Sequence, residues 1–220
     1  MRSIMKLAVG AVILLSAWGP QQSLAAPAFT TKYVYYKVSG DSAAGVYLSM
    51  LRRGPHVRGE KAYAATTAES SQRGKLEQKS SCRIRDYQYA IDFVIRLPKL
   101  SGEASLPPAA RARWRQFSSF VRRHEERHRA IWMGCAREIE TKIKALRGRT
   151  CHDVDRKAQA IRERIQKACN RKHRAFDATE QKKLAKHPFM KLVLAPIRPG
   201  KARTTHLASK KRKKSTALFN

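Results

Sequence analysis

Residues 124–128 are His-Glu-Glu-Arg-His, a combination of residue types suited to metal-dependent hydrolysis. Two histidines four positions apart lie on one face of a helix, with Cβ atoms about 5–6 Å apart, so both imidazoles can reach one metal ion. Zinc is the usual metal for such nitrogen ligands. Glu125 is offset from His124 by about 100° around the helix, which places it beside a metal-bound water. The pattern therefore predicts one zinc ion held by His124 and His128, with Glu125 as the general base.

The third zinc ligand is less clearly marked, and we expect either Asp177 or His173, which are four residues apart and can face one site. Glu138 is excluded on an unbroken helix, because ten residues beyond His128 correspond to about 15 Å along the axis. Neither metzincin spacing nor a second catalytic pair is present. The remaining candidates are His152, Asp153 and His187.

Two other interpretations of the histidine pair stay open. The two rings can be partly buried helix side chains that bind no metal, or they can bind a metal that performs no catalysis. Both fall on the apolar side of the predicted helix, which favours rings that face inward over rings on a solvated face. The oxyanion-stabilising group is unassigned, and the helical position of Arg127 argues against a direct role for it.

A long amphipathic helix must position the pair. Apolar residues and the two histidines recur every three or four positions from Trp114 to Leu146. Such a rod is longer than a small domain is wide, so we expect a bend or a break, with Gly134 as the candidate position. A second helix is expected after Asp153, with apolar positions up to Cys169, packed antiparallel to the first.

Strand patterns precede the helices. Residues 32–38 and 61–67 predict strands, and a short helix capped by Ser42 is expected between them, through Leu51. Residues 69–81 are polar and predict a loop. Residues 82–97 alternate strictly, which indicates a half-buried antiparallel strand ended by Pro98. The expected fold is α+β: a small antiparallel sheet packed on the long helix, with a second antiparallel helix and a basic C-terminal tail.

The N-terminal residues 1–25 are typical of a secretory signal, with a basic start, twelve apolar residues and Ser23-Leu24-Ala25 as a cleavage site. An uncleaved anchor is the alternative. We therefore expect an exported protein, periplasmic or secreted, with one domain over residues 26–185 and a basic, flexible tail over residues 186–220. No run of 18 apolar residues occurs, which excludes a multi-pass membrane protein.

Four cysteines in an exported chain favour two disulfides. Cys135 and Cys169 lie at similar distances from the turn expected near residues 148–152, which favours them as one pair. Cys82 and Cys151 would then form the other pair. Buried free thiols are the alternative. No CxxC pair is present, so a cysteine-built zinc site is not supported.

The chain has 220 residues, with 47 Lys and Arg against 16 Asp and Glu, a formal net charge of +31. This charge is consistent with a solvated basic surface or with an anionic partner, such as a cell-envelope polymer or a lipid surface. No nucleic-acid-binding motif accompanies it, so no specific nucleic acid is expected. A non-catalytic envelope protein that binds an anionic polymer is therefore the alternative to an enzyme.

An ordered series of segments resembles the DUF922 family, whose members are predicted secreted zinc-dependent proteases. The segments are KYVYYKVSGDSAAGVYLSMLRRGP, KAYAATT, Cys82, Leu97-Pro98 and WRQFSSFVRRHEERH, and the resemblance covers roughly residues 32 to 180.

The resemblance implies a zincin-like arrangement, zinc ligation by His124 and His128, and Glu125 as the base. It also matches the family's cysteines to Cys82 and Cys151. In relatives a Thr-x-His-Gly-like stretch follows the second helix, whereas the corresponding residues here are FDATEQKK, without that histidine. The expected function is an exported zinc metallopeptidase that acts on a peptide or protein substrate. An inactive relative of the family is a further alternative.

Overall fold

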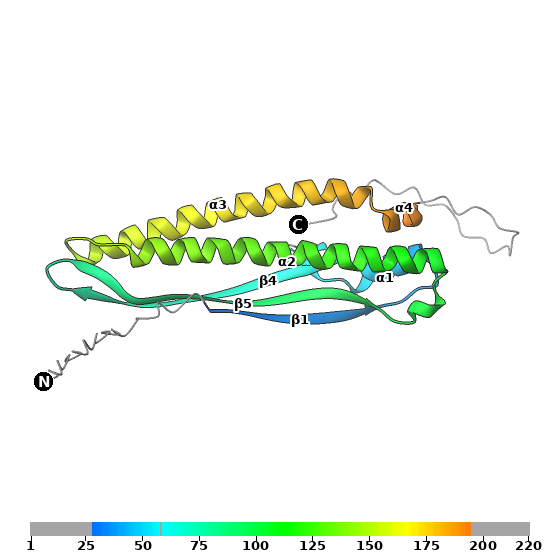
Figure 1. The fold of residues 1–220 in the computed structure, drawn as a ribbon, viewed down its shortest axis with the longest axis horizontal. Coiled ribbons are helices and arrows are strands. Elements are labelled where there is room, and N and C mark those ends of the chain that lie inside the picture. Colours follow the sequence, from blue (N-terminus) through cyan, green and yellow to red (C-terminus); the bar gives the residue numbers. More distant parts are fainter. Residues whose placement is uncertain (1–27, 58, 195–220) are drawn as a thin grey trace, which may run out of the picture.

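The computed structural model describes residues 28–57 and 59–194, which form an elongated α+β fold in three layers (Figure 1). A sheet forms the first layer, a long helix lies on it, and a second long helix lies on the first. The expected signal segment and the end of the basic tail lie outside the described residues.

The main sheet has the strand order β1-β5-β4. Its strands are β1 (Ala28–Val38), β4 (Ala65–Gln78) and β5 (Cys82–Leu100). β4 and β5 form an antiparallel hairpin, whereas β1 runs parallel to β5. The sheet is therefore mixed, and the expectation of an antiparallel sheet was wrong. Since β4 occupies one edge of β5 as its hairpin partner, β1 pairs with the other edge, and the intervening chain crosses between them through a helix.

β5 shows the predicted alternation, with every second side chain from Tyr87 to Leu97 buried toward the helices. Pro98 does not end the strand, which continues to Leu100. Pairing with β4 stops at Arg96, so Pro98 lies where β5 is paired with β1 alone, opposite Tyr36. A proline is tolerated where no ladder hydrogen bond is required of its nitrogen.

Residues 69–81 form most of β4 and the hairpin turn, so the predicted loop was wrong. Nearly all side chains from Glu69 to Gln78 are exposed, because this half of β4 is a sheet edge with little packed against it. Polar side chains are therefore compatible with the strand, and no apolar alternation marks it in the sequence. The backbone hydrogen bonds to β5 hold it in place.

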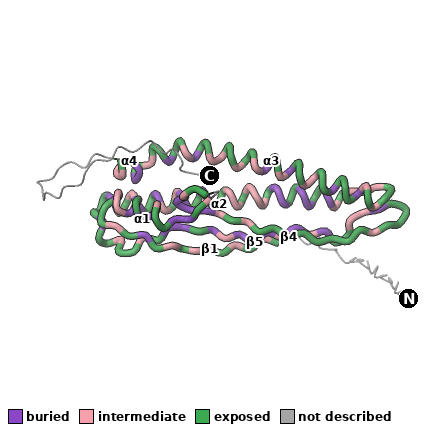
Figure 2. Tube along the Cα trace, turned by 180° about the vertical axis from the view of Figure 1, so that it is seen from behind, coloured by how far each residue is buried: buried purple, intermediate pink, exposed green. Residues whose placement is uncertain are grey.

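The layers above the sheet are α2 (Pro108–Lys144) and α3 (Cys151–Ala185), which pack against each other. α2 is a single helix through Gly134, so the chain is not broken there. A rod of about 55 Å fits here, because β5, with 19 residues at about 3.3 Å each, is about 63 Å long. Figure 2 shows the buried residues where α2 faces the sheet.

Shorter elements surround one end of α2. They are α1 (Ala43–Arg53), the hairpin of β2 (His56–Val57) and β3 (Glu60–Lys61), the 3-10 helix Glu103–Ser105, and α4 (Pro188–Leu194). Ser42 caps α1 as predicted, because its hydroxyl accepts a hydrogen bond from the Gly45 N–H. The tail was expected to be flexible from residue 186, but residues 188–194 form α4. Its Phe189 and Met190 are buried against α1 and α2.

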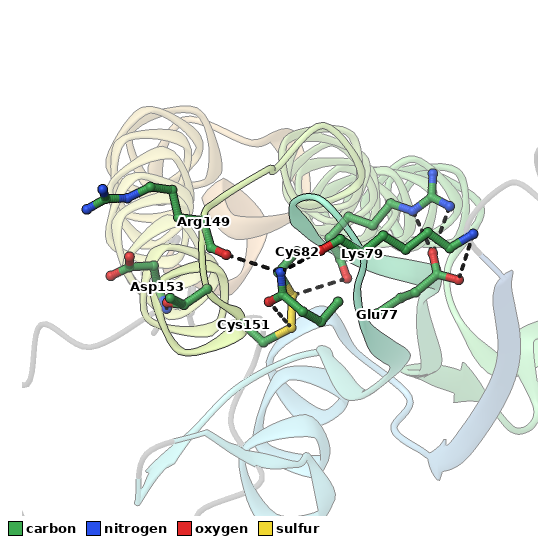
Figure 3. Close-up of a disulfide and its surroundings, with 9 residues drawn as sticks. Glu77, Lys79, Cys82, Arg149, Cys151 and Asp153 are labelled. Atoms are coloured by element: carbon green, nitrogen blue, oxygen red, sulfur yellow. Dashed lines mark hydrogen bonds and ion pairs between the residues drawn. A yellow bond between two sulfur atoms is a disulfide. The ribbon is translucent and has the colours of Figure 1, made fainter.

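Both predicted disulfides are present, with Cα–Cα distances of 5.0 Å for Cys82–Cys151 and 6.1 Å for Cys135–Cys169. Figure 3 shows that Cys82–Cys151 joins the start of β5 to the start of α3. The Gln78 side-chain amide donates to the Arg149 carbonyl beside it, at 3.2 Å. This disulfide therefore ties the β4–β5 hairpin to the turn between α2 and α3.

Two apolar clusters make up the core. One gathers around Phe117 and Phe189 at the α1–α4 end, and the other around Ile139 and Ile165 at the end with the disulfides. On α2, Val121 belongs to the first cluster and Cys135 to the second. The segment between them carries the HEERH sequence. Within residues 28–57 and 59–194, no helix has the length and apolar content needed to cross a bilayer.

Candidate metal centre

Three side-chain donor atoms converge between α2 and α3. His124 Nε2 lies 3.0 Å from His128 Nε2, and Asp177 Oδ1 lies 2.8 Å from His128 Nε2 and 3.5 Å from His124 Nε2. Ligand atoms about 2.0–2.1 Å from a tetrahedral zinc ion are about 3.3 Å apart, close to these separations. The cluster of His124, His128 and Asp177 therefore has the donor types and spacing of a three-ligand zinc site.

The buried state of the donors supports this interpretation. His124 is 2% exposed, and Oδ1 of Asp177 is buried and accepts no hydrogen bond from a described residue. Burial, reinforced by the nearby His128, lowers the pKa of His124 to about 4, so its ring is neutral near pH 7. A neutral imidazole is the form that binds a metal, and a buried carboxylate oxygen that faces it favours a cation between them.

Asp177, rather than His173, supplies the third converging donor atom. Nδ1 of His173 lies 2.8 Å from Nδ1 of His128, which is the ring nitrogen on the opposite side from the converging atoms. A proton shared there leaves the Nε2 lone pair of His128 directed toward Asp177 and His124. The sequence alone did not decide between the two residues as the third donor, and the structure places them on different sides of the His128 ring.

Other predicted candidates lie elsewhere. His152 and Asp153 are in the first turn of α3, and Asp177 follows Asp153 by 24 residues, about 36 Å along the helix. Asp153 pairs with Arg156 there. The ring of His187 packs edge-on against Phe117, with a centroid distance of 5.6 Å, at the start of α4.

Glu125 is buried at the base of the site, with 3% of its surface exposed. The Thr66 hydroxyl, on β4, donates to Glu125 Oε2 at 2.7 Å. Burial raises the pKa of Glu125 to about 7. A carboxyl group with such a pKa can both accept and release a proton near neutral pH.

Thr66 was not predicted as a site residue, because its proximity to Glu125 depends on the pairing of β4 with β5. Phe176 was also missed: it stacks on His124, with a centroid distance of 4.9 Å and an interplanar angle of 27°. For the α3 residues that line the site, the sequence did contain a usable signal. Asn170, His173 and Asp177 are spaced three and four apart and so share one face of the helix.

A pocket of about 180 Å³ opens at the site, between β4, α2 and α3. Its lining is apolar on the strand side and polar on the helix side, as is usual for small-ligand sites. The residues that line it are Val57, Ala62, Ala64, Ala65, Thr66, His124, Glu125, His128, Trp132, Asn170, His173 and Asp177.

Comparison with known proteins bears on this arrangement. The family model described as "Bacterial protein of unknown function (DUF922)" matches residues 33–185. The chain belongs to the DUF922 family. This match includes every element that contributes to the pocket. No curated protein and no solved structure matches the chain.

The DUF922 match also places FDATEQKK, residues 176–183, inside the family region. In the structure this segment is part of α3 and does not follow it. The segment supplies Asp177 at the converging donor atoms. A carboxylate oxygen is an accepted zinc ligand beside two imidazoles, so the cluster has three suitable donor groups.

Proposed function

We propose that this DUF922 protein is a zinc-dependent metallopeptidase that hydrolyses peptide bonds. The observation that carries the proposal is the convergence of His124 Nε2, His128 Nε2 and Asp177 Oδ1 beside the buried carboxyl group of Glu125. His124, His128 and Asp177 would hold the zinc ion. When bound, zinc supplies Lewis acidity, which favours ionisation of water and polarises a carbonyl group.

Glu125 carries the proton transfers in this proposal. Its carboxylate accepts a proton from the attacking water and later delivers it to the leaving amine. Thr66 holds one carboxylate oxygen in place at 2.7 Å, which fixes the orientation of the base. Stacking of Phe176 on His124 keeps one ligand ring from rotating.

Export to the periplasm or the exterior is part of the proposal. The two disulfides fit an exported protein, because such bonds persist in oxidising compartments. The N-terminal residues typical of a secretory signal agree with them. The substrate would accordingly be a peptide or protein outside the cytosol.

The test compares Glu125→Gln with the parent protein. We expect each to contain about one zinc per chain by metal analysis, and the variant to lose hydrolysis of a quenched fluorescent peptide library by at least about a hundredfold. Glu126→Gln is the matched control, because Glu126 is the next residue and pairs with Arg122 outside the pocket. Equal hydrolysis by Glu125→Gln would overturn the role of Glu125. A zinc-loaded parent protein that cleaves no peptide would overturn the peptidase function.

A further inference from the structure

The outer side of α3 carries a row of cations that the proposed activity does not use. At about 100° per residue, six basic side chains fall within a sector of about 100° of the helix, and each is exposed. The row extends over 26 residues, about 37 Å along the helix. We refer to it as the α3 ridge: Lys157, Arg164, Lys167, Arg171, Arg174 and Lys182.

None of the six ridge side chains forms an ion pair or a hydrogen bond with another residue in the described ranges. Their neighbours on the same helix behave differently. Arg156 pairs with Asp153 at 2.8 Å, and Lys183 pairs with Glu180 at 2.7 Å. No ridge cation is therefore paired with a carboxylate of α3, although the exposed Glu163 lies beside the row, about 20° outside its sector.

The high net charge alone does not produce such a row. On the exposed face of the sheet, Lys32 and Arg96 are accompanied by Asp92 and Glu69, which lie opposite each other on β5 and β4. From Lys157 to Lys182, by contrast, the ridge sector contains no acidic residue. The residues between its cations are small, including Ala160, Ala175 and Ala178.

We propose that the α3 ridge binds the surface of a bilayer rich in anionic phospholipid. Charge complementarity is the basis, because each Lys or Arg near such a surface attracts the anionic headgroups. The ridge lies along one side of a single long helix, so its cations can approach a flat surface together. Alanines between the cations offer no large apolar side chain for insertion, so binding is electrostatic and peripheral.

This orientation leaves the candidate metal centre accessible. Asn170, His173 and Asp177 lie about a third of a turn around α3 from the centre of the ridge. With the ridge on the bilayer, the pocket opens sideways, about one helix diameter, or ~10 Å, from the headgroups. The inference does not rest on the proposed peptidase activity, because no ridge residue lines the pocket.

The test is co-sedimentation of the full chain with vesicles of phosphatidylcholine that contain about 30% phosphatidylglycerol, an anionic lipid to which polybasic segments bind. Pure phosphatidylcholine vesicles give the baseline. Arg164→Glu, Lys167→Glu and Arg171→Glu combined should weaken binding at least about a hundredfold, since each cation contributes about fivefold. Higher salt should also weaken binding of the parent protein.

The matched control combines Lys32→Glu, Lys75→Glu and Arg96→Glu, three exposed cations of the sheet. It changes the net charge equally and should bind within about threefold of the parent protein, since its substitutions lie off the ridge. Equal loss in both triple variants, or no loss in the ridge variant, would overturn the proposal. Ridge-dependent binding to heparin without ridge-dependent binding to vesicles would also overturn it, in favour of a soluble polyanion.

Two further measurements separate this inference from folding and from the metal centre. Replacement of the three ridge residues by Gln, with thermal unfolding followed by circular dichroism, shows whether the loss occurs in a folded chain. His124→Ala should leave vesicle binding unchanged, and the ridge variant should keep its zinc. Loss of vesicle binding in His124→Ala, with the ridge intact, would contradict a docking surface that is independent of the metal centre.

Discussion

Asp177 Oδ1 lies 2.8 Å from Nε2 of His128, although the two residues are on different helices. One donor group thus comes from α3 and two come from α2. The candidate site depends on the relative position of the two long helices as much as on the HEERH segment itself.

Asp177→Ala should remove most zinc binding. One of three protein ligands is lost, and the cost should exceed the 10–100-fold typical of supporting residues, so we expect zinc affinity to fall by more than about a hundredfold. Competitive titration with a chelating dye measures this affinity. Asp155→Ala is the control, because Asp155 is an exposed carboxylate of the same helix. Unchanged affinity in Asp177→Ala would exclude Asp177 as a ligand.

His173→Ala should weaken zinc binding by about 10–100-fold while one zinc still binds at saturation. The reason is that His173 contacts Nδ1 of His128 and orients its ring, without contributing a converging atom. His173→Gln can still accept a hydrogen bond and should restore part of the affinity. Complete loss of zinc at saturating concentration in His173→Ala would instead make His173 a ligand.

The Cys135–Cys169 disulfide should support both stability and zinc affinity. Its removal by Cys135→Ala and Cys169→Ala should cost about 3–4 kcal/mol in free energy of unfolding, from the lost constraint on the unfolded chain. Because Cys169 is one turn from His173, zinc affinity should also fall. Chemical denaturation and zinc titration measure the two effects.

The Cys82–Cys151 pair is the matched control for that prediction. It closes a longer stretch of 69 residues, so its removal should cost at least as much stability. It lies at the hairpin end, away from the pocket residues, so zinc affinity should stay unchanged in the metal-loaded, folded variant. If both double variants lose zinc equally, the effect is general destabilisation.

Stability should fall as the pH decreases below the ordinary histidine pKa of about 6.5, partly through His187. Burial and the nearby Arg123 lower the pKa of His187, so the unfolded chain binds the proton more readily than the folded chain does. The Nδ1 atom of His187 also accepts the Phe189 N–H at the start of α4, and protonation removes this acceptor.

His187→Asn tests the titration, because Asn keeps a capping oxygen and does not ionise. Between pH 7.5 and 5.5 the melting temperature of the parent protein should fall further than that of the variant, because only the parent carries the ionising group. Parallel pH profiles of the two proteins would contradict the prediction.

Local patterns predicted the elements of this fold more completely than their pairing. The helix of residues 124–128 and the alternating strand of residues 82–97 are marked by periodic burial within one element, which is visible in the sequence. The register of α3 on α2 is a long-range property, so Asp177 and His173 could not be separated before the structure placed them. Thr66 was missed for the same reason.

Local patterns also could not predict the direction of β1, or that residues 69–78 form a strand. β1 has the same alternation whether it pairs parallel or antiparallel with β5. The outer half of β4 buries almost nothing, so hairpin hydrogen bonds, rather than apolar side chains, determine its conformation. Hydrogen-bond pairing between distant segments leaves little periodic trace in the sequence.

The Cys82–Cys151 disulfide crosslinks one end of the elongated molecule and Cys135–Cys169 joins α2 to the middle of α3, whereas α1 and α4, at the opposite end (Figure 1), are held by packing and hydrogen bonds without a disulfide in the described residues. Fraying therefore starts at the α1–α4 end, where amide protons will exchange first, and it stops where the crosslinked helices begin.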